Sequence, residues 1–313
     1  MDLWFSENHT KNAKFSIRVN RQLASVNSDF QRIDVFESKE FGRFLTLDGY
    51  MMVTEKDEFI YHEMIVHVPL AVHPRPEKVL VIGAGDGGVV RELARYDSVK
   101  HIDLVEIDSE VVRICKEYLP VTACALEDPR VHIFYQDGLK FIRRWEDTYD
   151  LIIVDSTDPF GPGEGLFTRE FYGNCFKALK EDGIMVNQHE SPFYEEDAAA
   201  MQRAHKLIVE SFPISKVYQA HIPTCLLHTS LQRKQGYHFE LYWICFWNGR
   251  NRSRGCYAPT YRVEHNPYLY FIYLRRLEQH SFALWTAVHT EIVLSLQTRK
   301  DGNHAGGSCT AKI

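Results

Sequence analysis

The sequence predicts an α/β protein, in which a small antiparallel β-sheet precedes a doubly wound, mostly parallel sheet. Three observations lead to this prediction. Up to about residue 55, short alternating runs are broken by turn residues. From about residue 56, nearly continuous apolar strands alternate with helical segments, and a glycine-rich turn follows the first of these strands. We therefore expect an N-terminal β-sheet domain over residues 1–55 and an α/β domain over residues 56–224.

The N-terminal domain is predicted from the alternating runs 30–36 and 42–47. Asp48-Gly49 follows the second run and supplies the residue pair that tight hairpin turns prefer, just before the apolar residues 51–53. This pattern indicates a small antiparallel sheet.

The larger domain is predicted from strands and helices in alternation. The expected strands are 78–82, 101–105, 131–135, 151–154 and 184–187. The expected helices are 89–96, 109–118 and 194–212, and Pro120 lies just beyond the second. Strands as apolar as these are typical of a parallel sheet that is covered by helices on both faces.

Composition limits the classes of protein to which the chain can belong. The chain has 313 residues, 45% hydrophobic and 25% charged, with a formal net charge of −6, which is typical of a soluble globular protein. This balance gives no indication of nucleic acid or an anionic membrane as a partner. No run reaches the roughly 18 apolar residues of a membrane helix. We expect no secretory signal, because no apolar segment precedes Asp2, Glu7 and Lys11.

The seven cysteines form no CxxC pair. This spacing favours reduced thiols over disulfides or a metal site, and hence a cytoplasmic location.

The last part of the chain differs in character from the rest. Residues 226–313 hold 11 Lys and Arg against 5 Asp and Glu, whereas the whole chain is acidic. We treat 225–313 as a divergent C-terminal segment in which 237–247 could form a strand and 268–279 a strand or helix. The Gly-, Ser- and Ala-rich end, 302–313, is expected to be disordered.

A ligand site is predicted at the glycine-rich turn Gly83-x-Gly85-x-x-Gly88, which lies between a strand and a helix. Such a turn is Rossmann-like and lets the backbone approach a ligand closely. Glu106 ends the next strand, where a carboxylate accepts hydrogen bonds from ribose hydroxyls. Both NAD enzymes and S-adenosylmethionine methyltransferases use this arrangement, so the turn alone indicates only an adenosine derivative.

Asp86 within the turn narrows the choice of ligand. Its carboxylate would repel the pyrophosphate of NAD and the carboxylate of S-adenosylmethionine, but would attract a bare ammonium. Decarboxylated S-adenosylmethionine, with a sulfonium and a terminal amine, suits this charge. The alternative is that Asp86 only caps the following helix.

A second acidic residue, Asp137, precedes Gly138 just after a predicted strand. At that position a carboxylate can accept a hydrogen bond from an adenine amino group. An aspartate before glycine is also a common turn feature, and the residues alone leave both interpretations open.

The strand 151–154 is followed by Asp155-Ser156-Thr157-Asp158-Pro159. It delivers two carboxylates, three residues apart, to the edge of the sheet where α/β proteins bind ligands. One carboxylate can hold a cationic amine and the other can accept a proton from an attacking nitrogen. Ordinary methyltransferases do not need such a pair. The Gly- and Pro-rich segment 160–167 could close over the site; the alternative is a capping pair before a plain loop.

Tyr61 and His62 lie at the junction of the two predicted domains. A tyrosine hydroxyl could orient an amine, and a neutral imidazole could bind a polar group of a ligand. From the residues alone, packing at the domain interface is the preferred interpretation.

With these residues in place, the chain resembles the spermidine synthase (polyamine aminopropyltransferase) family, bacterial type, from Met1 to Thr224. The matching segments are Phe30-Gln31, Leu47-Asp48-Gly49, Thr54 to Phe59, Tyr61-His62-Glu63, Gly83-x-Gly85-Asp86-Gly87-Gly88, Glu106-Ile107-Asp108, Asp137-Gly138, Asp155 to Pro159, Gly161-Pro162 and His221-Ile222-Pro223-Thr224.

The resemblance implies a role for each site residue. Decarboxylated S-adenosylmethionine would be the co-substrate, and its expected contacts are Gln31, His62, Gly83, Gly85, Asp86, Glu106, Asp137 and Gly138. Glu106 would bind the ribose and Asp137 would lie near the adenine. Putrescine would be handled by Tyr61, Asp155 and Asp158, with Asp155 as the catalytic base. The family transfers the aminopropyl group by direct displacement, giving spermidine and methylthioadenosine, with no metal and no tightly bound cofactor. A homodimer or homotetramer is expected.

The resemblance ends at Cys225, where the family has a tyrosine followed by Pro-Ser-Gly and an apolar strand. The sequence therefore predicts the loss of a substrate-contacting tyrosine and of the strand that completes the sheet, leaving an open edge. The change in composition fits a shifted reading frame or a joined segment. The alternatives to an active enzyme are an inactive or unstable homologue that still binds nucleoside and, less favoured, a methyltransferase.

Overall fold

The computed structural model describes most of the chain before residue 235. The described residues are 2–157, 161–189, 194–219, 222–224, 228–234, 239–241 and 274–276. The predicted disorder of 302–313 lies outside them, as do most of the segments 237–247 and 268–279. The short strands β14 (Phe239–Leu241) and β15 (Leu274–Arg276) fall within those two segments and form a two-stranded sheet.

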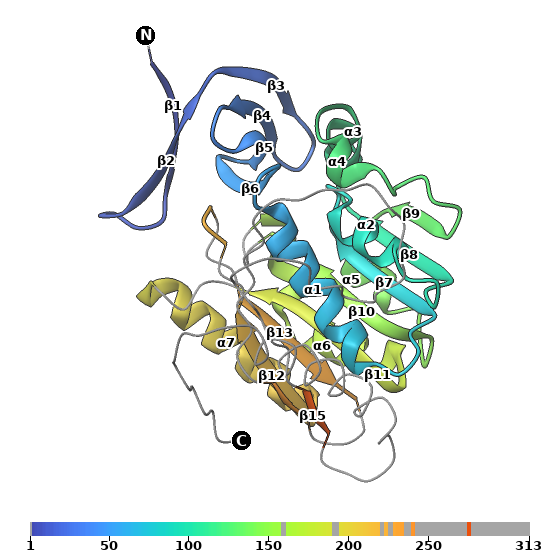
Figure 1. The fold of residues 1–313 in the computed structure, drawn as a ribbon. Coiled ribbons are helices and arrows are strands. Elements are labelled where there is room, and N and C mark those ends of the chain that lie inside the picture. Colours follow the sequence, from blue (N-terminus) through green and yellow to red (C-terminus); the bar gives the residue numbers. More distant parts are fainter. Residues whose placement is uncertain are drawn as a thin grey trace, which may run out of the picture. The chain divides into compact units, whose positions relative to one another are not determined.

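The N-terminal strands form two antiparallel sheets (Figure 1). A hairpin contains β1 (Leu3–Asn8) and β2 (Lys14–Val19), and a four-stranded sheet contains β3 (Arg21–Asn27), β4 (Arg32–Ser38), β5 (Gly42–Leu47) and β6 (Tyr50–Thr54). Asp48 and Gly49 both have positive φ angles, 51° and 86°, as the two-residue hairpin between β5 and β6 requires. The predicted small antiparallel sheet is thus confirmed.

The central sheet has the strand order β12-β13-β11-β10-β7-β8-β9. Its members are β7 (Lys78–Gly83), β8 (His101–Glu106), β9 (Val131–Tyr135), β10 (Tyr149–Asp155), β11 (Leu179–His189), β12 (Ile214–Gln219) and β13 (His228–Arg233). The five strands from β11 to β9 run parallel, and β13 is antiparallel to both of its neighbours. This is the doubly wound, mostly parallel sheet that the sequence predicts.

Helices cover both faces of this sheet (Figure 1). They are α1 (Glu58–Val72), α2 (Gly88–Ala94), α3 (Ser109–Tyr118), α4 (Pro120–Ala123), α5 (Gly138–Ile142), the 3₁₀ helix η1 (Gly161–Phe167), α6 (Arg169–Ala178) and α7 (Glu195–Ser211). One core contains α1, α2 and α3 against Val81 and Leu104, and the other contains α5, α6 and α7 against Leu80 and Ile152. Alternate residues of the same strands face the two cores, which explains why the strands are mainly apolar. No described helix is long and apolar enough to cross a membrane.

Helix α1 has no counterpart among the sequence predictions. Its buried residues, which include Ile60, Ile65, Val66 and Val68, are distributed around the helix rather than along one stripe. The cause is its position, because one apolar core contains α1 together with strands of the N-terminal sheet and of the central sheet. A helix that is buried on several sides lacks the period that reveals amphipathic helices. This placement brings Tyr61 and His62 to the junction of the two sheets.

The predicted loss of the closing strand is wrong. Strand β13 lies between β11 and β12, with Leu231 opposite Val186 and Ser230 opposite Val217. Its pairing depends on backbone N–H and C=O groups, which every non-proline residue provides whatever its side chain. Residues after the end of the resemblance therefore complete the sheet.

Candidate active site

The candidate site lies at the carboxyl ends of β7, β8 and β10. The order of the sheet reverses between β7 and β10, because the chain continues from β7 to β8 on one side and reaches β10 on the other. Ligands of open α/β sheets bind in the crevice at such a point. A cavity of about 190 Å³ occupies it. Its lining includes the predicted residues Gln31, Tyr61, His62, Gly83, Gly85, Asp86, Glu106, Asp137, Gly138 and Asp155. Asp158 lies outside the described residues.

Gly83 determines where Asp155 stands. Gly83 has a φ of +84°, and a Cβ at this position would lie 1.9 Å from the carbonyl oxygen of Asp155. The next residue, Ala84, donates its backbone N–H to that same oxygen at 2.8 Å. Only glycine combines this dihedral angle with so close an approach. The end of β7 thus fixes the backbone that carries the Asp155 carboxylate.

Tyr61 orients the Asp155 side chain. The Tyr61 hydroxyl, from α1, donates a short hydrogen bond to Asp155 Oδ1. Burial and the charge of Asp86 raise the pKa of Asp155 to about 6, although His62 and the Tyr61 hydrogen bond act in the opposite direction. A carboxylate with a raised pKa is a stronger base than an exposed one. The pair therefore suits proton transfer from a bound amine.

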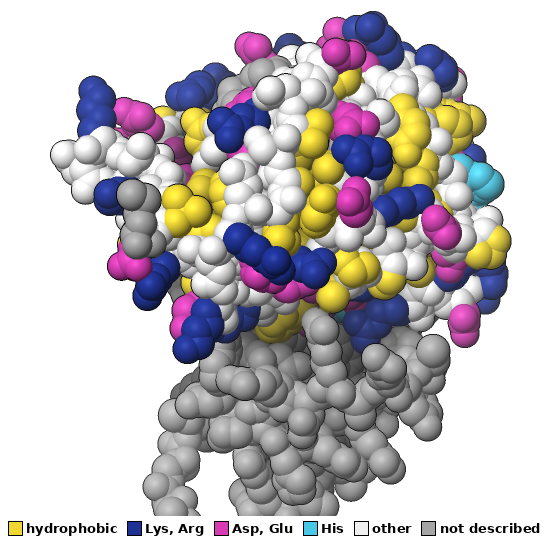
Figure 2. Space-filling view, turned by 90° about the horizontal axis from the view of Figure 1, so that it is seen from above, with side chains coloured by type: hydrophobic (Ala, Val, Ile, Leu, Met, Phe, Trp, Pro, Cys, Tyr) yellow, Lys and Arg dark blue, Asp and Glu magenta, His cyan; other side chains and the backbone are white. Residues whose placement is uncertain are grey.

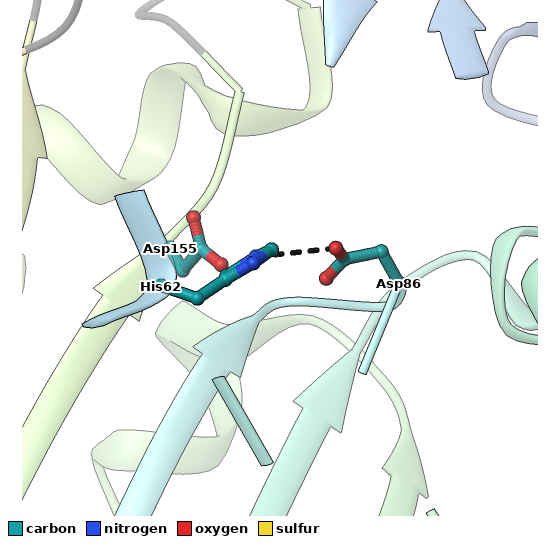
Figure 3. Close-up of side chains that lie close together, drawn as sticks. All are labelled: His62, Asp86 and Asp155. Atoms are coloured by element: carbon teal, nitrogen blue, oxygen red, sulfur yellow. Dashed lines mark ion pairs between the residues drawn. The ribbon is translucent and has the colours of Figure 1, made fainter. Parts of the chain in front are cut away.

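His62 stands between the carboxylates of Asp86 and Asp155 (Figure 3). Its Nδ1 donates to Glu58 Oε2 at 2.7 Å, and its Nε2 lies 3.2 Å from Asp86 Oδ2. The ring also packs on Gly88, where a Cβ would lie 2.2 Å from Cε1. The last glycine of the turn is thus required by the imidazole.

The protonation state of His62 differs from the predicted neutral imidazole. Burial alone would lower its pKa, but the charges and hydrogen bonds of Asp86 and Glu58 outweigh burial and raise the pKa to about 10. Both ring nitrogens face carboxylates, so both carry protons at neutral pH. In this form His62 presents donors and offers no lone pair.

The geometry of Asp86 is compatible with both roles that the sequence left open. Its Oδ1 accepts the backbone N–H of Gly88, the first residue of α2, at 3.2 Å. Its Oδ2 is buried and ion-paired with His62, but makes no geometrically good hydrogen bond with the described residues. His62 lowers the pKa of Asp86 against the effect of burial. Asp86 is therefore an anion with one oxygen able to accept a hydrogen bond from a ligand.

Glu106 and Gly85 occupy the next part of the cavity. A Cβ at Gly85 would lie 2.9 Å from Glu106 Oε2, so the turn and the carboxylate are in close contact. Glu106 Oε1 accepts the backbone N–H of Asp108 at 2.9 Å, which leaves Oε2 on the cavity side. Burial raises the pKa of Glu106 to about 7. Its position at the end of β8 is the one that binds ribose hydroxyls in related folds.

Asp137 caps α5 and also lines the cavity. Its Oδ1 accepts the backbone N–H of Leu139 at 2.8 Å, and Gly138 behind it is buried against Ile82. Oδ2 makes no such capping bond, and the Lys140 ammonium lies 3.9 Å from it. The capping interpretation and the ligand interpretation are thus compatible.

The N-terminal domain contributes Gln31 to the site. Gln31 Nε2 and Ser28 Oγ both donate to Asp108 Oδ2, at 3.0 and 2.7 Å. Asp108 Oδ1 in turn caps α3 by accepting the N–H of Glu110. These bonds hold the loop between β3 and β4 at the rim of the cavity.

Several residues of the site were not selected from the sequence. Glu58 and Arg91 lie behind His62, and Glu7 and Gln188 line the cavity. The spacing of Glu58 and His62, four positions apart in a helix, was an available signal once α1 was recognised. The contact of Arg91 with Glu58 joins residues 33 positions apart and has no local signature.

The lining of the cavity is rich in carboxylates. Figure 2 shows that the face seen from above carries Lys and Arg side chains interspersed with Asp and Glu, and hydrophobic side chains between them. The cavity instead gathers the carboxylates of Asp86, Glu106, Asp137 and Asp155. A ligand with positive charge suits this lining.

Comparisons of the sequence with known proteins identify its family. Residues 58–232 match the family described as spermine/spermidine synthase domain, and residues 3–55 match the spermidine synthase tetramerisation domain. The polyamine aminopropyltransferase of Alkaliphilus oremlandii (strain OhILAs) is 72% identical over 224 residues, which are 72% of this chain and 79% of that protein. The polyamine aminopropyltransferase of Clostridium beijerinckii is 69% identical over the same shares.

Solved structures give the same result. A spermidine synthase in complex with the transition state analogue AdoDATO superposes with a TM-score of 0.72 at 42% identity, covering 74% of this chain and 80% of that one. Spermidine synthase from Thermotoga maritima superposes with a TM-score of 0.71 at the same identity and coverage. The matches of both domains, the close relatives and the shared fold therefore place this chain in the spermine/spermidine synthase family.

Proposed function

We propose that this chain is a spermidine synthase, which transfers the aminopropyl group of decarboxylated S-adenosylmethionine to putrescine. The observation that carries the proposal is the convergence of Asp86 and Asp155 on either side of His62, in a cavity that continues to Glu106 and Asp137. The names of the similar proteins, polyamine aminopropyltransferase and spermidine synthase, support it. A homo-oligomer in the cytoplasm is part of the proposal, and the match to a tetramerisation domain supports the oligomer.

Each residue has a task in this proposal. Gln31, Glu106 and Asp137 bind the nucleoside, with Glu106 accepting from the ribose and Asp137 from the adenine. Asp86 binds the terminal ammonium of the aminopropyl group through Oδ2. The same carboxylate would oppose the extra carboxylate of intact S-adenosylmethionine, which disfavours a methyltransferase.

Tyr61 and Asp155 act on the second substrate. The putrescine amine must be neutral to attack the carbon beside the sulfonium. Asp155 accepts its proton, and Tyr61 keeps the carboxylate oriented. The new N–C bond forms as the C–S bond breaks, and the bonding electron pair stays on sulfur to give neutral methylthioadenosine. Asp158, three positions after Asp155, is proposed to hold the diamine.

The test is turnover by the purified full chain supplied with decarboxylated S-adenosylmethionine and putrescine. We expect spermidine and methylthioadenosine in equal amounts, and a loss of at least ~10²-fold in kcat for Asp155→Asn. Folded protein that binds methylthioadenosine without forming spermidine would instead indicate an inactive homologue with a functional nucleoside site. Transfer of a methyl group from intact S-adenosylmethionine would overturn the proposal. Cadaverine and agmatine, tested in parallel, define the preferred amine.

A further inference from the structure

A buried chain of charged side chains lies behind His62 and ends at the cavity. Arg91 of α2 donates to both carboxylate oxygens of Glu58, at 2.9 and 2.8 Å. Glu58 accepts from His62 Nδ1 at 2.7 Å, and His62 Nε2 pairs with Asp86 at 3.2 Å. The Glu58 side chain is fully buried and His62 is 3% exposed. Four alternating charges thus connect α2 to the carboxylate in the glycine turn.

The orientation of the His62 ring depends on Glu58. One side of the ring packs on Gly88, where even a methyl group would not fit. Tyr61 contacts it edge-on, with the ring centroids 5.3 Å apart. Neither contact selects which ring atoms face Asp86. The hydrogen bond from Nδ1 to Glu58 does so, because it directs Nε2 towards Asp86.

The Arg91 fork in turn fixes Glu58. Its Nε and Nη1 atoms also donate to Glu92 and to the carbonyl of Val121, so the guanidinium is held on three sides. Paired geometry of this kind gives a carboxylate a single orientation. Glu58 is therefore held in one orientation, although it is not part of the cavity lining.

The charges around His62 balance only when Glu58 is ionised. His62 is faced by Glu58 and Tyr61 from α1, by Asp86 from the turn after β7 and by Asp155 from β10. With His62 protonated, the two positive charges of Arg91 and His62 balance the two negative charges of Glu58 and Asp86. Loss of the Glu58 charge would leave Asp86 and Asp155 to share one imidazole, and would weaken the bond that holds its far nitrogen.

We propose that Glu58, held by Arg91, is a positioning residue for aminopropyl transfer, which acts through His62 to place Asp86 against the terminal ammonium of the nucleoside substrate. This inference rests on the proposed function. It predicts that Glu58 affects the binding and reaction of the substrate that carries the aminopropyl group. Binding of the nucleoside part should not change, because Glu106 and Asp137 lie elsewhere in the cavity.

The experiment compares Glu58→Gln with Glu63→Gln. Glu63 lies on the same helix and is half-buried, but its carboxylate lies near Glu92 and His67 rather than near the His62 ring nitrogens. For Glu58→Gln we expect kcat/KM for decarboxylated S-adenosylmethionine to fall ~10- to 100-fold. The Kd for methylthioadenosine, which has no amine chain, should stay within about twofold. Glu63→Gln should match the wild type in both.

Titration of His62 provides a readout that does not depend on turnover. The ¹³Cε1 signal of His62, followed by NMR from pH 6 to 11, reports its protonation. Since Glu58 is one of the groups that raise the pKa of His62, the midpoint should move to lower pH in Glu58→Gln and remain unchanged in Glu63→Gln. If Glu58→Gln fails to fold because Arg91 is left unpaired, the double variant Glu58→Gln/Arg91→Gln removes both charges, and the same results are expected.

The outcomes separate the two proposals. An inactive wild type would contradict the proposed function, while ligand affinities and the His62 titration would still decide the role of Glu58. Equal loss of affinity for both nucleosides would show a merely structural role and overturn the inference. Unchanged kinetics together with an unchanged His62 midpoint would overturn it as well.

Discussion

The two halves of the central sheet differ in the side chains that their strands bury. Strands β7, β8 and β10 bury mainly apolar side chains, with Asp103 and Asp150 as buried exceptions, and they end beside the cavity at Gly83, Glu106 and Asp155. Strand β13 buries polar side chains along its length, with Thr229, Ser230 and Gln232 all 2% exposed or less. Both halves pair into one sheet. The comparison shows that an apolar pattern makes a strand recognisable in the sequence. A strand without that pattern can still form between two neighbouring strands, because its backbone pairs with both of them.

The difference also follows the course of the chain. Thr224, the last residue of the resemblance, donates its N–H and hydroxyl to the buried carboxylate of Asp57, just before α1. Strand β13 begins four positions later and lies beside β11, whose Gln188 lines the cavity. The side of the site next to β11 is therefore completed by a strand that begins after Thr224 and that lies almost wholly within the family match of residues 58–232.

The largest expected effect comes from replacing Gly83 at the end of β7. Gly83→Ala introduces a Cβ 1.9 Å from the Asp155 carbonyl at a φ of +84°. We expect at least ~3 kcal/mol of destabilisation in urea unfolding, and loss of turnover in whatever protein folds. Gly49→Ala is the matched control, because its φ is +86° with open space around the position. It should cost only the dihedral strain of about 1–2 kcal/mol. Equal effects of the two variants would mean that the close approach to Asp155 is unimportant.

A smaller effect is expected from Tyr61→Phe, which removes the hydroxyl that orients Asp155. Turnover at pH 7 should fall by ~10-fold or more, with unchanged affinity for methylthioadenosine. Tyr96→Phe is the control, since that hydroxyl bonds His67 on the other side of α1. Full activity in Tyr61→Phe would limit Tyr61 to packing between the domains.

The acid limb of the pH profile tests the same pair without changing the fold. Asp155 must be ionised to accept a proton, and its pKa is raised to about 6 in the folded protein. Activity should therefore rise with pH through about 6, rather than near the ordinary aspartate value of about 3.9. Because Tyr61 acts to lower this pKa, the midpoint should move to higher pH in Tyr61→Phe.

Glu106 ionises in the same range, with a pKa raised to about 7, so nucleoside binding needs its own profile. The limb assigned to Asp155 should appear in kcat at saturating nucleoside. A wild-type kcat that stays constant between pH 5 and 7 would contradict the assignment of Asp155 as the base.

The apolar half of the sheet and most of its site were accessible from the sequence. The strands around Gly83, Glu106 and Asp155 were predicted because a local pattern, an apolar run and then a polar end, determines both the strand and the position of its functional residue. The two roles of Asp86 could not be separated, since one carboxylate oxygen accepts the first backbone N–H of α2 and the other faces the cavity.

What the sequence did not reveal depends on contacts between distant residues. Helix α1 lacks an amphipathic period because it is packed between two sheets, and the Arg91–Glu58 pair joins two helices. The charged state of His62 follows from carboxylates contributed by different elements. Strand β13 was missed for the opposite reason, since its own residues argue against a buried strand.

The smallest expected effect comes from replacing a buried polar residue of β13, Gln232. Gln232 is fully buried opposite Met185, and its Oε1 has no hydrogen-bond partner among the described residues. Its Nε2 donates to Ser230 at 2.6 Å. An unsatisfied buried acceptor costs about 1–3 kcal/mol, more than one neutral hydrogen bond returns. Gln232→Met keeps the length of the side chain and removes the acceptor.

We expect Gln232→Met to raise the free energy of unfolding by about 1 kcal/mol, measured in urea, with no change in kcat. The matched substitution Gln22→Met, in the N-terminal sheet, removes a side chain whose amide bonds Asp34 at 2.7 Å near the surface, and it should not stabilise. Destabilisation by Gln232→Met would mean that the bond to Ser230 outweighs the unpaired oxygen. In that case the polar residues of β13 would form a satisfied network, and the two halves of the sheet would differ in composition but not in quality of packing.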